Sequence, residues 1–150
     1  MSAHAANLGP IRPPLVYLAS IGAGLLVRPV QWLPAPIGTP VGVILVLAAV
    51  ALFVFSVRTF RKASTPVPGN LPTTVIVRAG PYRFSRNPIY VAFTLFQLGL
   101  AAWVNSFALL LTLAPAIALM MVVIGREERY LESRFPADYA QYRREVRRWL

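Results

Sequence analysis

The segment Gly80–Tyr90, with the sequence GPYRFSRNPIY, holds the densest group of chemically capable side chains in the chain. Asn is a favoured N-cap residue and Pro is favoured at the first helical position, so Asn87 and Pro88 predict that a helix begins there. The free backbone N–H groups of that first turn, with Arg83 and Arg86 beside them, would suit a carboxylate or a phosphate. The alternative is a capped helix whose arginines contact anionic lipid headgroups.

A second group is the pair of adjacent carboxylates Glu127 and Glu128, which follows a long apolar segment. Carboxylates are unfavourable at the C-terminal end of a helix, so we expect this helix to continue to about Arg134, with Arg126 and Arg129 offsetting the acids. Two carboxylates in such a place could hold a cationic ligand or accept hydrogen bonds from a ribose. The alternative is a solvated charged turn that binds no ligand.

Composition limits what other chemistry is available. The sequence has no cysteine and one histidine, His4. Thiolate nucleophiles, disulfides and cysteine-ligated zinc are therefore excluded, and metal catalysis has few ligands to draw on. We expect no residue to act as a covalent nucleophile and no metal site.

The charges are distributed as in a membrane protein. Hydrophobic residues make up 57% of the 150 residues and charged residues 13%, which is too little polar surface for a water-soluble domain. All five acidic residues follow Arg126, whereas the basic residues before it flank apolar segments. This pattern is typical of membrane-spanning segments, and it argues against a nucleic-acid partner.

The apolar segments predict an all-α, polytopic membrane protein with about four transmembrane helices, since one span needs about 20 apolar residues. The last two spans form a hairpin that breaks at Asn105 and Ser106. A proline-rich loop, Pro34–Pro40, leads into the second span. The first span is short, and a cleaved signal sequence is the alternative there. The predicted spans cover residues 13–30, 38–58, 88–104 and 106–125.

The positive-inside rule places the arginine-rich loop, residues 61–87, and the tail, residues 126–150, in the cytosol. Four spans then put both termini in the cytosol, and we expect residues 1–150 to form one domain in the bacterial inner membrane. The tail predicts an amphipathic helix that lies against the membrane or the underside of the domain. Its apolar face would carry Tyr139, Tyr142, Val146 and Trp149.

This topology brings the two chemically capable groups to the cytosolic mouth of one helical hairpin. The first group supplies hydrogen-bond donors and positive charge, and the second supplies negative charge. A zwitterion with a separate cation matches that arrangement. S-adenosylmethionine, with its carboxylate, ammonium, sulfonium and ribose, is such a ligand.

From about Val67 to Trp149 the sequence resembles the isoprenylcysteine carboxyl methyltransferase and phospholipid methyltransferase family of integral membrane enzymes. The motifs that carry the resemblance are, in order, Gly80-Pro81-Tyr82-Arg83, Arg86-Asn87-Pro88-Ile89-Tyr90, Glu127-Glu128, Leu131, Phe135, Tyr139, Tyr142, Val146 and Trp149. The resemblance implies that S-adenosylmethionine binds in a cytosol-facing pocket formed by loop 61–87, the start of the third span and the base of the fourth. The implied cofactor-binding residues are Thr74, Val75, Ile76, Val77, Tyr82, Asn87, Pro88, Ile89, Tyr90 and Glu127.

The sequence departs from the family pattern at two positions. Family members usually have His where Asn87 stands, so a hydrogen bond made there would be insensitive to pH near neutrality. In the isoprenylcysteine enzymes an arginine one turn before the glutamate is expected to hold the substrate carboxylate, and here that position is Val123. The substrate-binding role then passes to Arg126 or Arg129. The acceptor stays open between a carboxylate, of a prenylcysteine-like or lipid molecule, and a lipid amine.

The mechanism that follows is direct in-line methyl transfer in a dry site, with the acceptor arriving laterally from the bilayer and the donor from the cytosol. The alternative from another class is a non-enzymatic membrane scaffold or assembly protein that binds anionic lipid or a partner through its arginines. A channel or transporter is disfavoured, because no charged residue lies in the middle of a predicted span.

Overall fold

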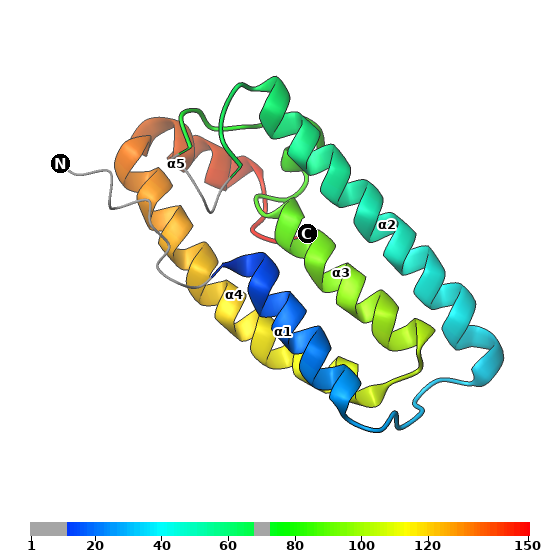
Figure 1. Cartoon of the computed structure of the whole chain (residues 1–150). Coiled ribbons are helices and arrows are strands. Elements are labelled where there is room, and N and C mark those ends of the chain that lie inside the picture. Colours follow the sequence, from blue (N-terminus) through cyan, green and yellow to red (C-terminus); the bar gives the residue numbers. More distant parts are fainter. Residues whose placement is uncertain (1–11, 68–72) are drawn as a thin grey trace.

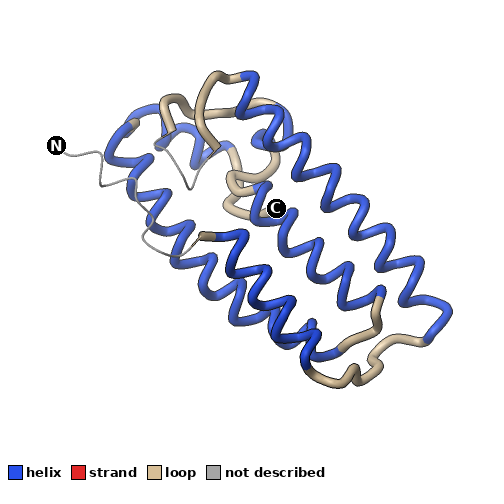
Figure 2. Tube along the Cα trace, viewed as in Figure 1, coloured by secondary structure: helices blue, strands red, loops and turns tan. Residues whose placement is uncertain are grey.

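The helices of the chain stand side by side as a bundle, with the loop between the second and third helices and the last helix gathered at one end (Figures 1 and 2). The computed structural model describes residues 12–67 and 73–150. Over these residues the chain is helical and contains no strand, which confirms the prediction of an all-α fold. Its elements are α1 (Pro13–Leu26), α2 (Ala35–Lys62), the 3-10 helix η2 (Gly80–Arg83), α3 (Pro88–Trp103), α4 (Phe107–Arg134) and α5 (Pro136–Glu145). The predictions for His4, for the N-terminus and for residues 68–72 of loop 61–87 lie outside the described residues.

Two helices of the described chain, α2 and α4, are long and apolar enough to cross a membrane, whereas α1 and α3 are shorter apolar helices. At ~1.5 Å per residue, the 28 residues of α4 extend about 42 Å, which exceeds the ~30 Å hydrocarbon core of a bilayer. The apolar part of α4 is therefore sufficient for one span, and its charged last turns extend beyond it. That all four helices cross the membrane stays a prediction.

Some predicted boundaries were wrong at the proline-rich turns. Helix α1 ends at Leu26 rather than near residue 30, because Val27 is extended and Arg28 precedes a proline, which disfavours helical backbone. The predicted loop Pro34–Pro40 is mostly helical, since α2 begins at Ala35 and its first-turn proline gives up only an N–H that needs no helical partner. The same helix runs on to Lys62 and so contains the whole of the predicted second span, residues 38–58.

The break between α3 and α4 falls where the sequence predicted it. The side chain of Ser106 accepts a hydrogen bond from the backbone N–H of Leu109, and Asn105 has a positive φ of 50°. The Asn105 side chain also accepts from the backbone N–H groups of Trp32 and Leu33, both at 3.0 Å, and donates to the carbonyl of Leu33 at 2.8 Å. It thereby fastens the loop between α1 and α2 to the loop between α3 and α4.

Glycines bring α2 and α3 into backbone contact. A Cβ atom on Gly99 would lie 2.9 Å from the backbone nitrogen of Val46 and 3.0 Å from the carbonyl oxygen of Gly42. A Cβ atom on Gly38 would lie 2.8 Å from the carbonyl oxygen of Ala102. Gly38 and Gly42 are four residues apart, which is the spacing of small residues that lets membrane helices approach closely. The pairing of α2 with α3 therefore depends on these positions having no side chain.

A polar cluster inside the bundle attaches α1 to α3 and α4. The fully buried Gln97 donates from Nε2 to Ser20 at 2.7 Å and to the carbonyl of Leu109 at 3.1 Å. One helical turn away, the hydroxyls of Tyr17 and Thr94 are 2.7 Å apart. Such bonds hold apolar helices in one register, and they fix α1 beside the part of α3 nearest the site.

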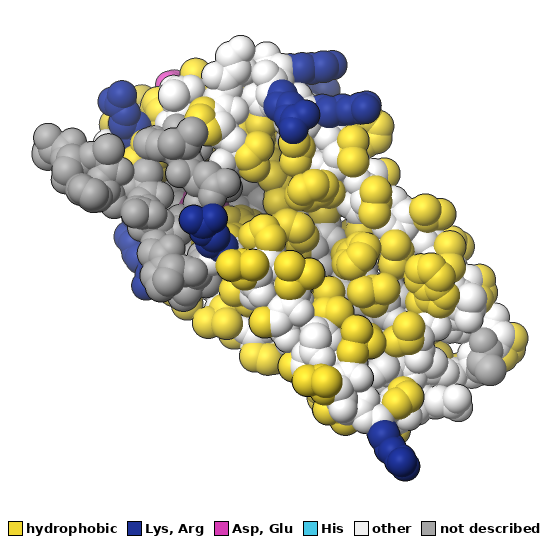
Figure 3. Space-filling model, viewed as in Figure 1, with side chains coloured by type: hydrophobic (Ala, Val, Ile, Leu, Met, Phe, Trp, Pro, Cys, Tyr) yellow, Lys and Arg dark blue, Asp and Glu magenta, His cyan; other side chains and the backbone are white. Residues whose placement is uncertain are grey.

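The surface of the bundle is apolar over its length and basic at one end. Figure 3 shows hydrophobic side chains covering the helices, with most of the visible lysines and arginines gathered around the end that holds α5. On α2, Ile44 is 65% exposed and Leu47 is 64% exposed. Contiguous apolar exposure of this kind suits lipid as the surrounding solvent.

The tail differs from its prediction. Helix α5 stops at Glu145, where Val146 turns extended, so Val146 and Trp149 do not belong to the helix. The two tyrosines of the predicted apolar face, Tyr139 and Tyr142, are buried against Ile76, Leu131 and Phe135. The tail therefore packs on the protein itself, and contact of α5 with a membrane stays a prediction.

Candidate functional site

The two groups of chemically capable residues meet at the basic end of the bundle. The hydroxyl of Tyr90, in the first turn of α3, donates to Oε1 of Glu127 at 2.7 Å. The meeting follows from the α3–α4 hairpin, because α4 continues to Arg134 and so carries its acids back past the start of α3. Tyr90 is buried and Glu127 is half-buried. The predicted proximity of these two side chains is thus present in the structure.

Glu127 lies in the charged last turns of α4, beyond its apolar part, in surroundings that disfavour a negative charge. The pKa of Glu127 is raised to about 7, mainly by burial and also by the negative charge of Glu128, while the hydrogen bond from Tyr90 lowers it. A carboxyl group in this state titrates near neutral pH. A cation placed beside it would restore its ionised form, so the position suits a positively charged ligand.

Glu128 points to different partners from its neighbour. Its Oε1 accepts from Nη2 of Arg86 at 3.0 Å and from Nε of Arg148 at 3.1 Å, and its Oε2 accepts from Nη2 of Arg148 at 2.6 Å. The side chains of Arg86 and Glu128 are only 8% and 12% exposed. Two guanidinium groups therefore hold Glu128, and the two adjacent acids stand in opposite electrostatic surroundings.

Asn87 stands at the predicted N-cap position, but its side chain does not cap α3. Its amide nitrogen instead donates to the carbonyl of Arg148 at 2.9 Å. The predicted capping bond, in which the side-chain oxygen of Asn87 would accept from the first turn of α3, is absent, and the side chain instead bonds to the chain that folds back after α5. Pro88 begins α3 as predicted, and both residues are buried.

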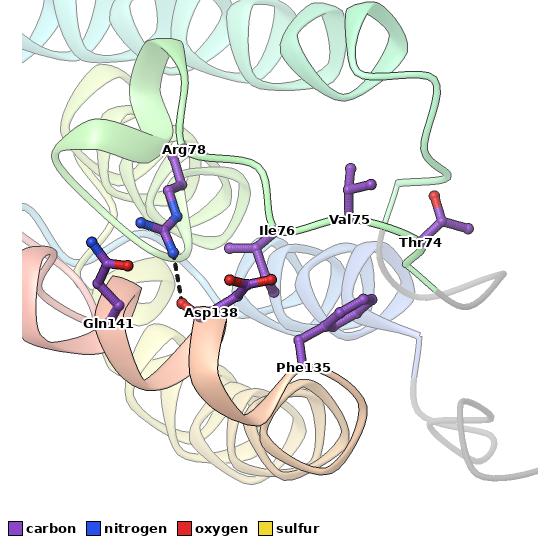
Figure 4. A pocket seen from close by; sticks show the side chains of 7 residues that line it. All are labelled: Thr74, Val75, Ile76, Arg78, Phe135, Asp138 and Gln141. Atoms are coloured by element: carbon purple, nitrogen blue, oxygen red, sulfur yellow. Dashed lines mark hydrogen bonds between the residues drawn. The ribbon is translucent and has the colours of Figure 1, made fainter.

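The predicted cofactor strip, Thr74–Val77, is divided between two environments. Val77 is buried with Phe60 and Tyr82, whereas Ile76 packs towards the tyrosines of α5. On its other side the strip borders an open pocket of about 560 Å³ at the corner between α4 and α5 (Figure 4). The pocket is lined by Thr74, Val75, Ile76, Arg78, Phe135, Asp138 and Gln141.

The pocket and the Tyr90–Glu127 pair are separate places with a short path of contacts between them. The guanidinium of Arg78, which lines the pocket, lies 5.8 Å from the ring centre of Tyr142. The hydroxyl of Tyr142 donates to the carbonyl of Tyr82 at 2.8 Å. Burial raises the pKa of the Tyr82 phenol well above its usual range, and the charge of Glu127 contributes to this, so Tyr82 lies within electrostatic reach of that carboxylate.

The remaining predicted site residues lie less centrally. Arg126 and Arg129 are exposed, whereas Tyr90 is buried. Val123 is fully buried in an apolar cluster that includes Tyr90. Ile89 is half-buried in the first turn of α3.

Sequence reasoning missed the pocket residues of the α4–α5 corner as site candidates. Phe135, Asp138 and Gln141 come together because the chain turns at Phe135, between α4 and α5. The signal that was present is Pro136, since a proline is favoured in the first turn of a new helix.

Comparison with known proteins gives one family match. Residues 37–138, more than half of the chain, match the model of the phospholipid methyltransferase family. This segment contains most of α2, all of η2, α3 and α4, and the beginning of α5. No solved structure matches the chain significantly.

Several curated proteins resemble part of the chain. The cobalt-zinc-cadmium resistance protein CzcN of Cupriavidus metallidurans is 46% identical over 70 residues, which are 46% of this chain and 32% of that protein. The nickel-cobalt-cadmium resistance protein NccN of Alcaligenes xylosoxydans xylosoxydans is 42% identical over 72 residues, which are 46% of this chain and 34% of that protein. An uncharacterized protein of Haemophilus influenzae is 38% identical over 63 residues, 41% of this chain and 100% of that protein. The matched part thus spans about a third of the length of the two resistance proteins.

Proposed function

The chain belongs to the phospholipid methyltransferase family and is a membrane protein of the methyltransferase kind, and from that premise we propose that it transfers the methyl group of S-adenosylmethionine to a membrane-soluble acceptor. We place the reaction at the cytosolic face of the bacterial inner membrane, where the positive-inside rule puts the basic end of the bundle. The observation that carries the proposal is the contact between Tyr90 and Glu127.

In this proposal Glu127 receives the positively charged or ribose-bearing part of the cofactor. The carboxylate is half-buried, its orientation is fixed by the Tyr90 hydroxyl, and it gains its charge most readily beside a cation. Charge-assisted hydrogen bonds in such partly buried places are roughly twice as strong as neutral ones. Glu127 is therefore the residue on which affinity for the cofactor should depend most.

The adenosine end of the cofactor would occupy the pocket at the α4–α5 corner. A volume of about 560 Å³ is within the range of small-molecule sites. Figure 4 shows Phe135 and Asp138 projecting from the helical corner towards the strip. The ring of Phe135 offers an apolar surface to a base, the carboxylate of Asp138 can accept from hydroxyl or amino groups, and the extended strip Thr74–Val77 offers backbone groups.

The chain's own residues would bind, orient and keep water out rather than attack the methyl group. When bound, S-adenosylmethionine supplies an electrophilic methyl carbon, which an acceptor lone pair takes as the carbon–sulfur bond breaks and its electron pair stays on sulfur. Partly buried apolar residues packed against the cluster that contains Tyr90, among them Phe93 and Trp149, would offer a dry surface for a lipophilic acceptor. The acceptor is a lipid amine or a carboxylate of a prenylcysteine-like or lipid molecule, and in the latter case Arg126 or Arg129 would hold the carboxylate.

The function is tested with the whole protein purified in detergent or in its membranes. We expect S-adenosylhomocysteine at about 100 times its Kd to stabilise the protein by about 2.7 kcal/mol, seen as a rise in Tm. We also expect labelled methyl from S-adenosylmethionine to appear in one species of a total membrane extract. A protein that is neither stabilised nor able to transfer label, while still folded by gel filtration, is not a methyltransferase of this type.

The pocket can be tested separately from the Tyr90–Glu127 contact. We expect Phe135→Ala and Asp138→Asn each to weaken S-adenosylhomocysteine binding by roughly 5- to 30-fold, as for the loss of one stacking surface or one good hydrogen bond. The control is Glu132→Gln, which removes an exposed acid of α4 that pairs with Arg143 outside the pocket. Titration calorimetry measures the affinities. Equal affinities of all three variants and the unmodified protein would place the adenosine elsewhere.

A further inference from the structure

We propose that Glu128 is a positioning residue that holds the segment Val146–Trp149, named here the strap, as a wall on the bilayer-facing side of the methyl-transfer site. The inference rests on the proposed function. It assigns Glu128 and Arg148 to placing the acceptor rather than to binding the cofactor.

The backbone of the strap is bonded to the residues directly before α3. The N–H of Arg86 donates to the carbonyl of Arg147 at 2.9 Å. The side-chain nitrogen of Asn87, Nδ2, donates to the backbone carbonyl of Arg148 at 2.9 Å. Ser85 and Arg147 form an isolated parallel β-bridge. The strap is therefore bonded to the residues that lead into the first turn of α3, the turn that carries Tyr90.

Glu128 adds the charged part of this attachment. It accepts two hydrogen bonds from the guanidinium of Arg148 and one from Arg86, as described above. Arg86 also donates from Nη1 to the carbonyl of Arg143 at 3.3 Å, near the end of α5. Charge-assisted bonds between partly buried groups such as these are strong and directional, so they define where the strap lies.

The far end of the strap reaches the apolar side of the site. Trp149 packs against the cluster that contains Tyr90 and Val123, and its ring N–H donates to the sulfur of Met121 at 3.3 Å. Met121 belongs to the apolar part of α4 and is 39% exposed on the outer surface of the bundle. Trp149 therefore covers part of the cluster that contains Tyr90 and contacts an exposed residue of α4, and in this proposal the lipophilic acceptor enters on that side.

The two adjacent acids thus have different roles in this proposal. Glu127 has one described hydrogen-bond partner, a phenol, and a raised pKa, which suits it to a cationic ligand. Glu128 has two guanidinium partners, so its charge is already balanced by the protein. Loss of Glu127 should then act on the cofactor, and loss of the Glu128–Arg148 pair should act on the acceptor.

The test uses Arg148→Gln, which removes the charged attachment of the strap but leaves the buried pair of Arg86 and Glu128 intact. We expect hydrogen exchange at the backbone amide of Arg86, which is bonded to the strap, to become at least about 10-fold faster. We expect methyl transfer into a total membrane extract, at saturating S-adenosylmethionine, to fall at least about 10-fold. The affinity for S-adenosylhomocysteine should change by less than about 3-fold.

Matched variants separate positioning from general damage. Arg148→Lys keeps one charged contact with Glu128 and should recover part of the transfer rate. Arg144→Gln removes an exposed arginine of α5, outside the strap, and should leave exchange, affinity and transfer unchanged. The Glu128→Gln variant should lose at least as much transfer as Arg148→Gln, and it should also lower the Tm, because it removes the partner of the buried Arg86.

Three results would overturn the inference. Faster exchange with an unchanged transfer rate would make the strap a purely structural attachment. An equal loss of S-adenosylhomocysteine affinity would assign the strap to the cofactor site. If the unmodified protein neither binds S-adenosylhomocysteine nor transfers methyl groups, the proposed function fails, whereas the first two results require it to hold.

Discussion

Replacement of Glu127 by glutamine is expected to weaken S-adenosylhomocysteine binding by roughly 10- to 100-fold and to raise the Tm of the ligand-free protein above pH 7. Glutamine keeps a carbonyl oxygen for the Tyr90 hydroxyl, so the side chain stays in place, but it removes the charge that the cofactor needs. The same charge is costly without a ligand, because burial raises the pKa of Glu127 to about 7 from 4.5.

The direction of the pH effect follows from these two pKa values. Below about pH 4.5 the carboxyl is protonated in both the folded and the unfolded chain, and the variant should then match the unmodified protein. As pH rises to about 7 the unfolded chain loses its proton first, so the folded protein loses stability, and above pH 7 the whole penalty is present. Cofactor affinity of the unmodified protein should instead increase from pH 6 to pH 8.

Thermal unfolding and titration calorimetry from pH 5 to pH 8 would measure both effects. Glu132→Gln serves as the control, since Glu132 is exposed and pairs with Arg143. A glutamine variant that binds S-adenosylhomocysteine as tightly as the unmodified protein at pH 8 would contradict the role given to Glu127. A Tm of the ligand-free Glu127→Gln variant that is lower than that of the unmodified protein above pH 7 would contradict the electrostatic account.

The Gly99→Leu and Gly42→Leu substitutions are expected to prevent assembly of the α2–α3 pair. Even a Cβ atom on Gly99 would come within 2.9 Å of the Val46 backbone, and backbone cannot move aside as a side chain can. Overpacking at an ordinary core position costs about 1–3 kcal/mol, and two helices forced apart along their contact should lose more than that. We expect little monodisperse protein on gel filtration and no cooperative thermal unfolding.

The matched control for these variants is Gly22→Leu. A Cβ atom on Gly22, which lies in α1, would meet no atom within 4 Å. The same substitution therefore causes no steric clash at the Cβ position. This variant should purify and unfold like the unmodified protein. If the Gly99 and Gly42 variants behaved like the control, the backbone contact between α2 and α3 would not hold the bundle together.

Much of the fold follows from local signals along the chain. Asn87-Pro88 and Ser106 mark helix starts through intrinsic preferences, and the unfavourable placement of acids at a helix end predicts that α4 continues to Arg134. The Pro34–Pro40 segment misleads for the same local reason, because proline is tolerated in a first helical turn as well as in a loop.

The site was predictable only where topology determines it. An antiparallel hairpin with a long second helix must bring Tyr90 near Glu127, so that contact could be expected from sequence. Which of Glu127 and Glu128 faces Tyr90, and where the Asn87 side chain turns, depends on the strap folding back over the start of α3. That return is a tertiary arrangement with no periodic pattern to reveal it.

The hydrogen bonds of the Asn105 side chain, at the end of the bundle opposite the site, limit how far the helices can move apart. Because its side chain fastens both connecting loops through three hydrogen bonds, the helices are pinned together at that end. Towards the other end of the bundle, the hydrogen bond between Tyr17 and Thr94 holds α1 to α3 one helical turn from Tyr90. Because α1 is anchored both at its end near Asn105 and beside Tyr90, a lipophilic acceptor that reaches Tyr90 does not need to enter between α1 and α3.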